Sequence, residues 1–315
     1  MKHTKIRGLV AATESTYNTA ANFNGSDAIV VDDDIEITPL EGETLQRKNI
    51  QPYPGMRRQF TVNQAVKISF SVELATSGAA GTPPRWGRLL KACGWSSTVI
   101  ANTSVAYNLL NINQAIESVT LVFEQDGTRH VATGCQGTLK LSGKLNDFAK
   151  ITFEFMGNYA NPIDTSMLSP SWANQAAPLP VAYGNTTELM INSWSGACLS
   201  EFEIDLKNEL TKRNLANCSE QIKITDRNAE GKLMIEAPAL ADQDFFSHAK
   251  NSAVIPISFK HADASGGKVA ITIPNFNVRP VKYTDLNGVV MLDVSGGLLP
   301  SSAGKDELSL LLTGP

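Results

Sequence analysis

The same order of segments occurs twice in this chain, on either side of residues 161–180, a stretch rich in Pro, Ser, Ala and Asn. Each half has a strand-like segment, a basic segment, another strand, a short helix, a hairpin and a closing strand. Identity between the halves is low, so matched order and segment type carry the comparison. We therefore predict a duplicated domain, with residues 1–160 and 181–315 as the two copies and 161–180 as the linker. The alternative that any two β domains would align this well stays open.

Four pairs of segments carry the comparison, with one two-residue offset after the first pair. They are Ile35–Ile37 with Phe202–Ile204, Leu45–Ile50 with Leu210–Leu215, Lys67–Phe70 with Lys232–Ile235, and Ile151–Gly157 with Val290–Gly296.

Alternating and β-rich runs dominate the chain and predict a mainly β fold. Asp126-Gly127 and Asn287-Gly288 are strong hairpin signals, because a type I′ turn needs positive φ at both central positions. Ser265–Gly267 is a third expected hairpin. Helix signals are confined to residues 84–93 and 241–250, which predicts one short helix flanking each set of strands.

Composition narrows the function classes. The chain has 315 residues, of which 42% are hydrophobic and 18% charged, so it can bury a sizeable core and is not a disordered, charge-rich chain. Its 27 basic and 31 acidic residues give a net charge of −4, which argues against a sequence-reading nucleic-acid protein. Apolar runs stay shorter than the roughly 18 residues of a membrane span, and we expect neither a secretory signal nor disulfides.

A search for catalytic or metal-binding motifs finds little. The histidines form no HExxH motif, and the cysteines fit no zinc spacing. Asp32-Asp33-Asp34 lacks the spaced ligands of a calcium loop, and Gly266-Gly267-Lys268 lacks the other residues of a phosphate loop. We therefore expect no catalytic residue, metal or cofactor, although an active site assembled from distant loops would escape such a search.

The layout resembles that of the major tail tube proteins of long-tailed (siphovirus-like) bacteriophages. The resemblance is carried by Ile35–Ile50 and Phe202–Asn217, by the strand–helix step Gly231–Asn251 with the hairpins that follow, and by the opening Arg7–Ala21. It covers nearly the whole chain, but no single motif is diagnostic. It implies tail-tube-type β-sandwich or barrel domains, each flanked by one short helix, that join into rings and stack into a tube.

The same resemblance implies a role and a set of partners. The protein would be a virion structural protein, assembled in the bacterial host cytoplasm, whose tube conducts double-stranded DNA into the host without binding it specifically. Its partners would be further copies of itself and the tape measure, tail tip and tail terminator proteins, with no membrane. Most members carry one domain per chain and form hexameric rings, so a doubled chain implies a trimeric, pseudo-hexameric ring.

The width of a DNA duplex also favours a ring of three two-domain chains, if each domain gives four strands to one inner barrel. Strands about 4.8 Å apart and tilted about 40° occupy about 6.3 Å of circumference each. Three domains then leave a bore of about 14 Å after side chains, less than the roughly 20 Å of B-DNA, whereas six leave about 38 Å. Three two-domain chains would therefore be needed.

Four acids are candidates for the wall of such a bore: Glu36, Glu154, Glu203 and Asp293. Each lies between two apolar residues of a strand, so each is expected to point away from the core. Glu36 is matched with Glu203, and Glu154 with Asp293, between the halves. An acidic lumen would repel phosphates and keep DNA moving, but a plain solvent-facing role on the tube exterior is equally compatible with the pattern.

Three polar segments are expected to become ordered mainly through contacts between subunits or rings: the N-terminal arm 1–25, the loop 76–84 and the C-terminal extension 298–315.

Two other classes of protein remain as alternatives. One is a secreted or surface β-sandwich adhesin or carbohydrate-binding protein, and the other is a tube-forming component of a secretion system.

Overall fold

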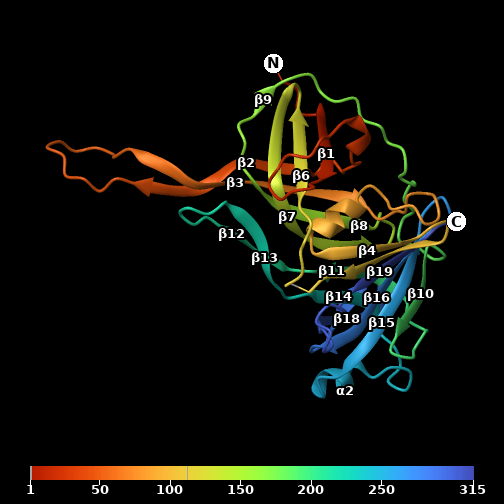
Figure 1. Cartoon of the computed structure of the whole chain (residues 1–315). Helices are drawn as coiled ribbons and strands as arrows, with labels where there is room; N and C mark the ends of the chain where they lie inside the picture. Colours follow the sequence, from red (N-terminus) through yellow and green to blue (C-terminus); the bar gives the residue numbers. More distant parts are fainter. Residues whose placement is uncertain (1, 112) are drawn as a thin grey trace.

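A computed structural model describes residues 2–111 and 113–315. The fold is mainly β with two short α-helices, which confirms the predicted fold class (Figure 1). The elements of the first half are β1 (Arg7–Thr13), the 3₁₀ helix η1 (Gly25–Asp27), β2 (Glu36–Gln46), β3 (Gln59–Glu73), α1 (Gly87–Ala92), β4 (Trp95–Ile100), β5 (Ser104–Leu109), β6 (Val119–Gln125), β7 (Thr128–Lys144), β8 (Lys150–Asn158) and β9 (Ile163–Asp164).

The elements of the second half are β10 (Thr186–Ile191), β11 (Leu199–Asp205), β12 (Asn208–Arg213), β13 (Gln221–Arg227), β14 (Glu230–Glu236), α2 (Phe245–Lys250), β15 (Val254–Ala262), β16 (Lys268–Val278), β17 (Lys282–Leu286), β18 (Val289–Leu298) and β19 (Ser309–Thr313). Both helices fall inside the ranges that the sequence predicts for them. In α2, the side chain of Asp244 caps the first turn by accepting the N–H of Ser247 at 2.9 Å.

The two halves share one order of strand pairing. In the first half neighbouring strands follow the order β2–β3–β8–β7–β6–β1, all antiparallel. In the second half the order is β11–β14–β18–β16–β15–β10, also antiparallel. One short helix follows the second strand of each series along the chain. Positions in one half can therefore be matched to positions in the other by their hydrogen-bonding register.

The halves are joined into one continuous sheet through β7 and β11. The second part of β7 pairs with β8 on one side and with β11 on the other, where Gly143 lies opposite Phe202. The resulting order is β2–β3–β8–β7–β11–β14–β18–β17, in which each half supplies four strands. The four strands per domain that the sequence-based bore estimate assumes are therefore present in each half.

Strand alternation places the core on one side of this sheet. In β3, Ile68, Phe70 and Val72 are buried while Lys67 is exposed. In the second half, the ring of Phe202 lies 4.8 Å from that of Phe259. Most buried apolar side chains of both halves form one large cluster, so the two halves share a core instead of folding around two separate ones.

A second joint between the halves is made near the C-terminus. Strand β19 pairs with β16 of the second half and with β5 of the first half. Residues 161–180 cross the outside of the first half in extended form (Figure 1). Along this path the N–H of Ser171 donates to Gly25 O and that of Ala176 donates to Thr76 O.

The three segments expected to depend on neighbouring subunits are instead packed within the chain, so that expectation is wrong. Strand β1 pairs with β6, and its Leu9 is buried. Thr76 is buried at the start of the loop 76–84, and Leu308 and Leu310 are buried in the C-terminal extension. Met1 lies outside the described residues. These segments are small and polar overall, but strand pairing and a few apolar side chains anchor them in the core.

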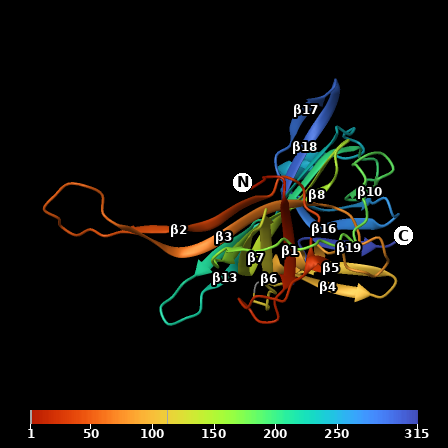
Figure 2. The same cartoon turned by 90° about the horizontal axis from the view of Figure 1, so that it is seen from above.

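Two hairpins project from the body toward the same side (Figures 1 and 2). The longer one is formed by the outer parts of β2 and β3, and its tip is residues 47–58. The shorter one is formed by β12 and β13, which make a separate two-stranded sheet. Both leave the sheet at the equivalent place in the strand order, between the first and second strands of each half.

Candidate assembly surface

The eight-stranded sheet has one apolar and one polar face. In β7, Leu139 and Leu141 are buried in the core, whereas Lys140 and Ser142, which alternate with them, are partly exposed. In β11 the same alternation buries Phe202 and leaves its neighbours polar. The polar face crosses the joint between the halves without interruption.

All four acids predicted from the sequence lie on this polar face. Glu36 and Glu154 are each opposite Ser69, and Glu154 is also opposite Thr138 of β7. Across the joint, Glu203 lies opposite Ser142, which is on the same face of β7 as Thr138. The position of Asp293 follows from the same register, because it lies opposite Met234, two residues from the partner of Glu203 on β14.

Two of the four acids are paired with lysines of neighbouring strands. Glu203 lies 2.9 Å from Lys140 across the joint, and Asp293 lies 3.2 Å from Lys232. Such partly exposed pairs contribute at most about 1 kcal/mol each. Within the described part of the chain, Glu36 and Glu154 have no basic group at ion-pair distance. The face is therefore mixed in charge, and only part of its acidity is free.

The register corrects one sequence match between the halves. Ser69 of β3 corresponds to Met234 of β14, because Glu154 and Asp293 lie opposite them. The residue opposite Met234 on β11 is Glu201, so Glu36 corresponds to Glu201 and not to Glu203. A two-residue error keeps a side chain on the same face, which is why both assignments point away from the core.

The two outer strands of the eight are open along one side. Among the described residues, β2 pairs only with β3, and β17 pairs only with β18. An open edge presents unpaired N–H and C=O groups that can pair with another chain. The surface that can extend this sheet therefore lies at its two ends.

Large apolar side chains are exposed at the tip of the longer hairpin. Ile50 is fully exposed, and Tyr53 and Met56 are largely exposed. The tip also carries Arg47, Lys48, Arg57 and Arg58. Exposed apolar side chains grouped on a projecting segment indicate a contact with another molecule. This exposed tip was not predicted from the sequence, although its apolar and basic residues around Pro52 and Pro54 stand in one run.

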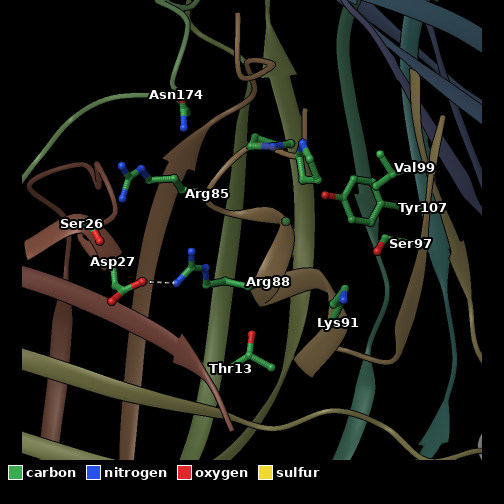
Figure 3. Close-up of a pocket in the computed structure, with 13 residues that line it drawn as sticks. Thr13, Ser26, Asp27, Arg85, Arg88, Lys91, Ser97, Val99, Tyr107 and Asn174 are labelled. Carbon is green, nitrogen blue, oxygen red and sulfur yellow. Dashed lines mark hydrogen bonds and ion pairs between the residues drawn. The ribbon is translucent and has the colours of Figure 1, made fainter. Parts of the chain in front are cut away.

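A cavity of about 650 Å³ lies between α1, the β4–β5 hairpin and residues near η1 (Figure 3). Its three basic side chains have partners: Arg88 donates to Asp27 at 2.9 Å and to Ala11 O at 2.7 Å, Lys91 lies 3.2 Å from Glu117, and Nε of Arg85 donates to Ala173 O at 2.8 Å. The hydroxyl of Tyr107 points into the cavity, and burial raises its pKa. These contacts hold α1 in place and do not form a catalytic group.

The histidines and acids do not gather into a metal site. Within residues 2–111 and 113–315, no group of three His, Cys, Asp or Glu side chains is placed to hold a metal ion. His261 is buried, its Nε2 lies 3.1 Å from Leu179 O, and burial lowers its pKa. Neither helix in this part of the chain is long and apolar enough to cross a membrane.

The fold is that of a mainly β protein with two open sheet edges and two projecting hairpins. The family model described as phage tail tube protein matches residues 4–297. The chain therefore belongs to the phage tail tube protein family, whose members are structural components of virus tails. A comparison with curated proteins finds no match.

Proposed function

We propose that this chain is the major tail tube subunit and that three copies close into a ring with pseudo-sixfold symmetry. Each copy would supply two tail-tube-type units, residues 1–160 and 181–315, connected by the linker 161–180. Stacked rings would form the tube through which DNA is ejected. Family membership and the shared pairing order of the two halves support this proposal.

The observation that carries the proposal is the eight-stranded sheet with two open edges. Its strands come equally from both halves, and it ends in β2 on one side and β17 on the other. Ring closure would pair both edges and so remove the hazard of uncontrolled pairing. Because the two edges differ, copies join head to tail, which gives a closed ring when the rotation between copies divides a full turn.

The strand number favours three copies. Each strand occupies about 6.3 Å of the circumference, so about 24 strands enclose a bore of about 38 Å once the side chains are subtracted. Two copies, or about 16 strands, would leave about 22 Å, hardly more than the roughly 20 Å width of B-DNA. A hydrated duplex would then contact the wall on all sides, whereas three copies leave room for water and ions.

The polar face of the sheet would line the bore. Glu36 and Glu154 would present free negative charge to the DNA, while Glu203 and Asp293 would be balanced by Lys140 and Lys232. A wall without excess cations neutralises few phosphates, so it gains little salt-dependent affinity for DNA. Such a surface lets a duplex pass without holding it.

The remaining parts of the proposal follow from the family. The projecting hairpin tip 47–58 would contact the next ring, since its apolar side chains are exposed in the described part of the chain. The ends of the tube would meet a tape measure, a tail tip and a tail terminator protein, with assembly in the cytoplasm of the bacterial host.

Negative-stain electron microscopy of the purified full chain tests the proposal. The expected result is rings or tubes with a central hole wider than a DNA duplex and threefold or pseudo-sixfold end views. A monodisperse monomer at every concentration, or a particle without a central hole, would contradict it. Glycan binding by such a monomer would favour an adhesin instead.

A further inference from the structure

We propose that β17 of one copy pairs antiparallel with β2 of the next copy, in the register that β7 and β11 already use inside the chain. This inference rests on the proposed ring and names the strands and residues that close it. The partner is a second copy of this chain. Inside the chain β7 is covered by β11, and each open edge is the counterpart of one of these two strands. Four observations lead to it.

The first observation is that β17 occupies the place of the second part of β7, whereas β16 occupies the place of the first part. Thr138 of β7 lies opposite Glu154, and Lys282 of β17 lies opposite Asp293, the residue that corresponds to Glu154. Counting along the two strands, Lys140 then corresponds to Thr284 and Ser142 to Leu286. In the first half this strand has a partner on its far side, namely β11. In the second half, no strand of residues 2–111 and 113–315 pairs with the far side of β17.

The second observation is that β2 occupies the place of β11. Glu36 corresponds to Glu201, so Thr38 corresponds to Glu203. A bulge follows in β2, where one extra residue is accommodated between Thr38 and Glu41. Because Ser69 corresponds to Met234, Ala65 four residues earlier corresponds to Glu230. After the bulge, Glu41 lies opposite Ala65 and Asp205 lies opposite Glu230, so Glu41 corresponds to Asp205.

The bulge explains how proline fits on this edge. Pro39 has no N–H to donate and would interrupt a regular ladder. Because it lies in the bulge, the extra residue that it provides does not need a partner of its own. Leu40 then takes the place of Ile204, which points into the core at the internal joint.

The third observation is that burial differs between equivalent positions. At the internal joint Leu139 and Ile151 are 1% and 0% exposed, whereas the equivalent Tyr283 and Val290 are 63% and 56% exposed. On the other edge, Ile204 is 1% exposed and its counterpart Leu40 is 46% exposed. Both open edges therefore carry large apolar side chains at positions that are buried wherever the joint is already formed.

The fourth observation is the register itself. Glu203 lies opposite Ser142, and Asp205 lies opposite Lys140. Transferred to the open edges, Thr38 of one copy lies opposite Leu286 of the next, and Glu41 lies opposite Thr284. The ion pair between Lys140 and Glu203 has no counterpart, since threonine stands at both equivalent positions, 284 and 38.

Disulfide trapping tests the register. The variant combines Thr38→Cys and Leu286→Cys with Cys198→Ser and Cys218→Ser, which remove the two exposed native thiols. Directly opposed residues of antiparallel strands have Cα atoms about 4.5–5.5 Å apart, within the range that a disulfide spans. Mild oxidation of the assembled protein is expected to shift the band on a non-reducing gel from monomer to dimer and trimer. The ladder should end at the trimer.

The matched control combines Thr38→Cys with Asp285→Cys in the same background. Adjacent residues of a strand point to opposite faces, so this pair is expected to remain monomeric on the gel. Thr38→Cys alone should also remain monomeric, because a head-to-tail joint does not bring two copies of residue 38 together. If the first pair does not assemble, Glu41→Cys with Thr284→Cys tests the same register.

The outcomes separate this inference from the proposed function. Rings or tubes with no cross-link in either predicted pair, or with equal cross-linking in the control, would overturn the register and leave the tube function standing. Absence of rings in the unmodified chain would overturn both. Cross-linking confined to the two predicted pairs, in preparations that show rings, supports the joint between β17 and β2.

Discussion

Gly143 on β7 lies directly opposite Phe202 on β11, and a Cβ at position 143 would lie 2.6 Å from Cζ of the phenyl ring. It would also lie 3.0 Å from a methyl group of Val181. The phenyl ring of Phe202 can lie across β7 only because position 143 carries no side chain. The joint between the two halves is thus closely packed on its core side.

Gly143→Ala is therefore expected to lower the free energy of unfolding by about 1–3 kcal/mol, the usual cost of forcing extra volume into a packed core. Chemical denaturation of the free protein measures it. Gly297→Ala is the matched control, since the nearest atom to a Cβ there is the end of Arg279 at 3.8 Å. Equal losses in both variants would show that the joint is not the cause.

A second contact between the halves depends on a buried carboxylate. Asp263, in the turn between β15 and β16, accepts the N–H of Thr76 at 2.8 Å and its hydroxyl at 2.5 Å. Its other oxygen accepts the N–H of Ser265 at 2.9 Å. Asp263→Asn is expected to cost about 2 kcal/mol at neutral pH, because hydrogen bonds to a charged group contribute about 1.5–3 kcal/mol.

The pH dependence of this contact has a defined sign. Burial alone would raise the pKa of Asp263, but the hydrogen bonds from Ser265 and Thr76 outweigh it and hold the pKa below its usual value. The stabilisation is therefore complete above the ordinary pKa of about 3.9 and is lost as the pH falls through the lower folded value. The stability difference between the unmodified chain and Asp263→Asn should be constant near neutrality and shrink below about pH 4. A difference that is constant down to pH 2 would contradict the assignment.

Local patterns predicted the fold where short-range chemistry decides it. The turns at Asp126-Gly127 and Asn287-Gly288 connect β6 to β7 and β17 to β18, with positive φ at all four residues. The hairpin of β4 and β5 was missed. Its turn lacks glycine, and Asn102 instead adopts a φ of 55°. The segment that contains β1 was expected to become ordered through contacts between subunits because it is small and polar, yet pairing with β6 buries residues 9–12 within the chain.

The assembly surface was predictable only in part. Alternation was enough to orient Glu36, Glu154, Glu203 and Asp293 away from the core, since side-chain direction in a strand is a local property. The pairing of Glu203 with Lys140 depends on which strands meet at the joint. That choice joins residues from the two halves of the chain, and local periodicity does not encode it. The bulge in β2 likewise obscured the true match between the repeats.

The C-terminal extension is expected to depend on one buried ion pair. Nη2 and Nε of Arg227 donate to the carboxylate of Glu307 at 2.7 and 3.1 Å, and both side chains are almost fully buried. Glu307→Ala would leave the guanidinium without its partner, at a cost of about 3–5 kcal/mol. Thermal unfolding should show a lower midpoint, and limited proteolysis should cut residues 298–315 sooner. The exposed Lys305→Ala is the control and should resemble the unmodified chain.

The tip of the longer hairpin is expected to control stacking and not folding. Ile50→Ser with Met56→Ser removes two side chains that are 99% and 84% exposed in the single chain. If these side chains are buried between rings, each contributes about 1.5–3 kcal/mol per contact. Electron microscopy should then show rings with few or short tubes, while circular dichroism of the free protein is unchanged. Tyr183→Ser, at a fully exposed position outside the hairpin, should leave tube length unchanged.

The last prediction concerns which face of the sheet lines the bore. Glu154→Cys, in the Cys198→Ser and Cys218→Ser background, places a thiol on the polar face, where Glu154 is exposed in the single chain. In free subunits it should react with a small maleimide and with one attached to a polymer wider than the bore. In assembled tubes the small reagent should still react, because it enters with the solvent, and the polymer should not. Asp164→Cys, at an exposed position on β9 outside this sheet, should react with both reagents in both states if assembly leaves β9 on the exterior. Equal polymer labelling of Glu154→Cys before and after assembly would place this acid on the outside of the tube, and the repulsive lumen would have to be abandoned while the ring and its strand joints could stand.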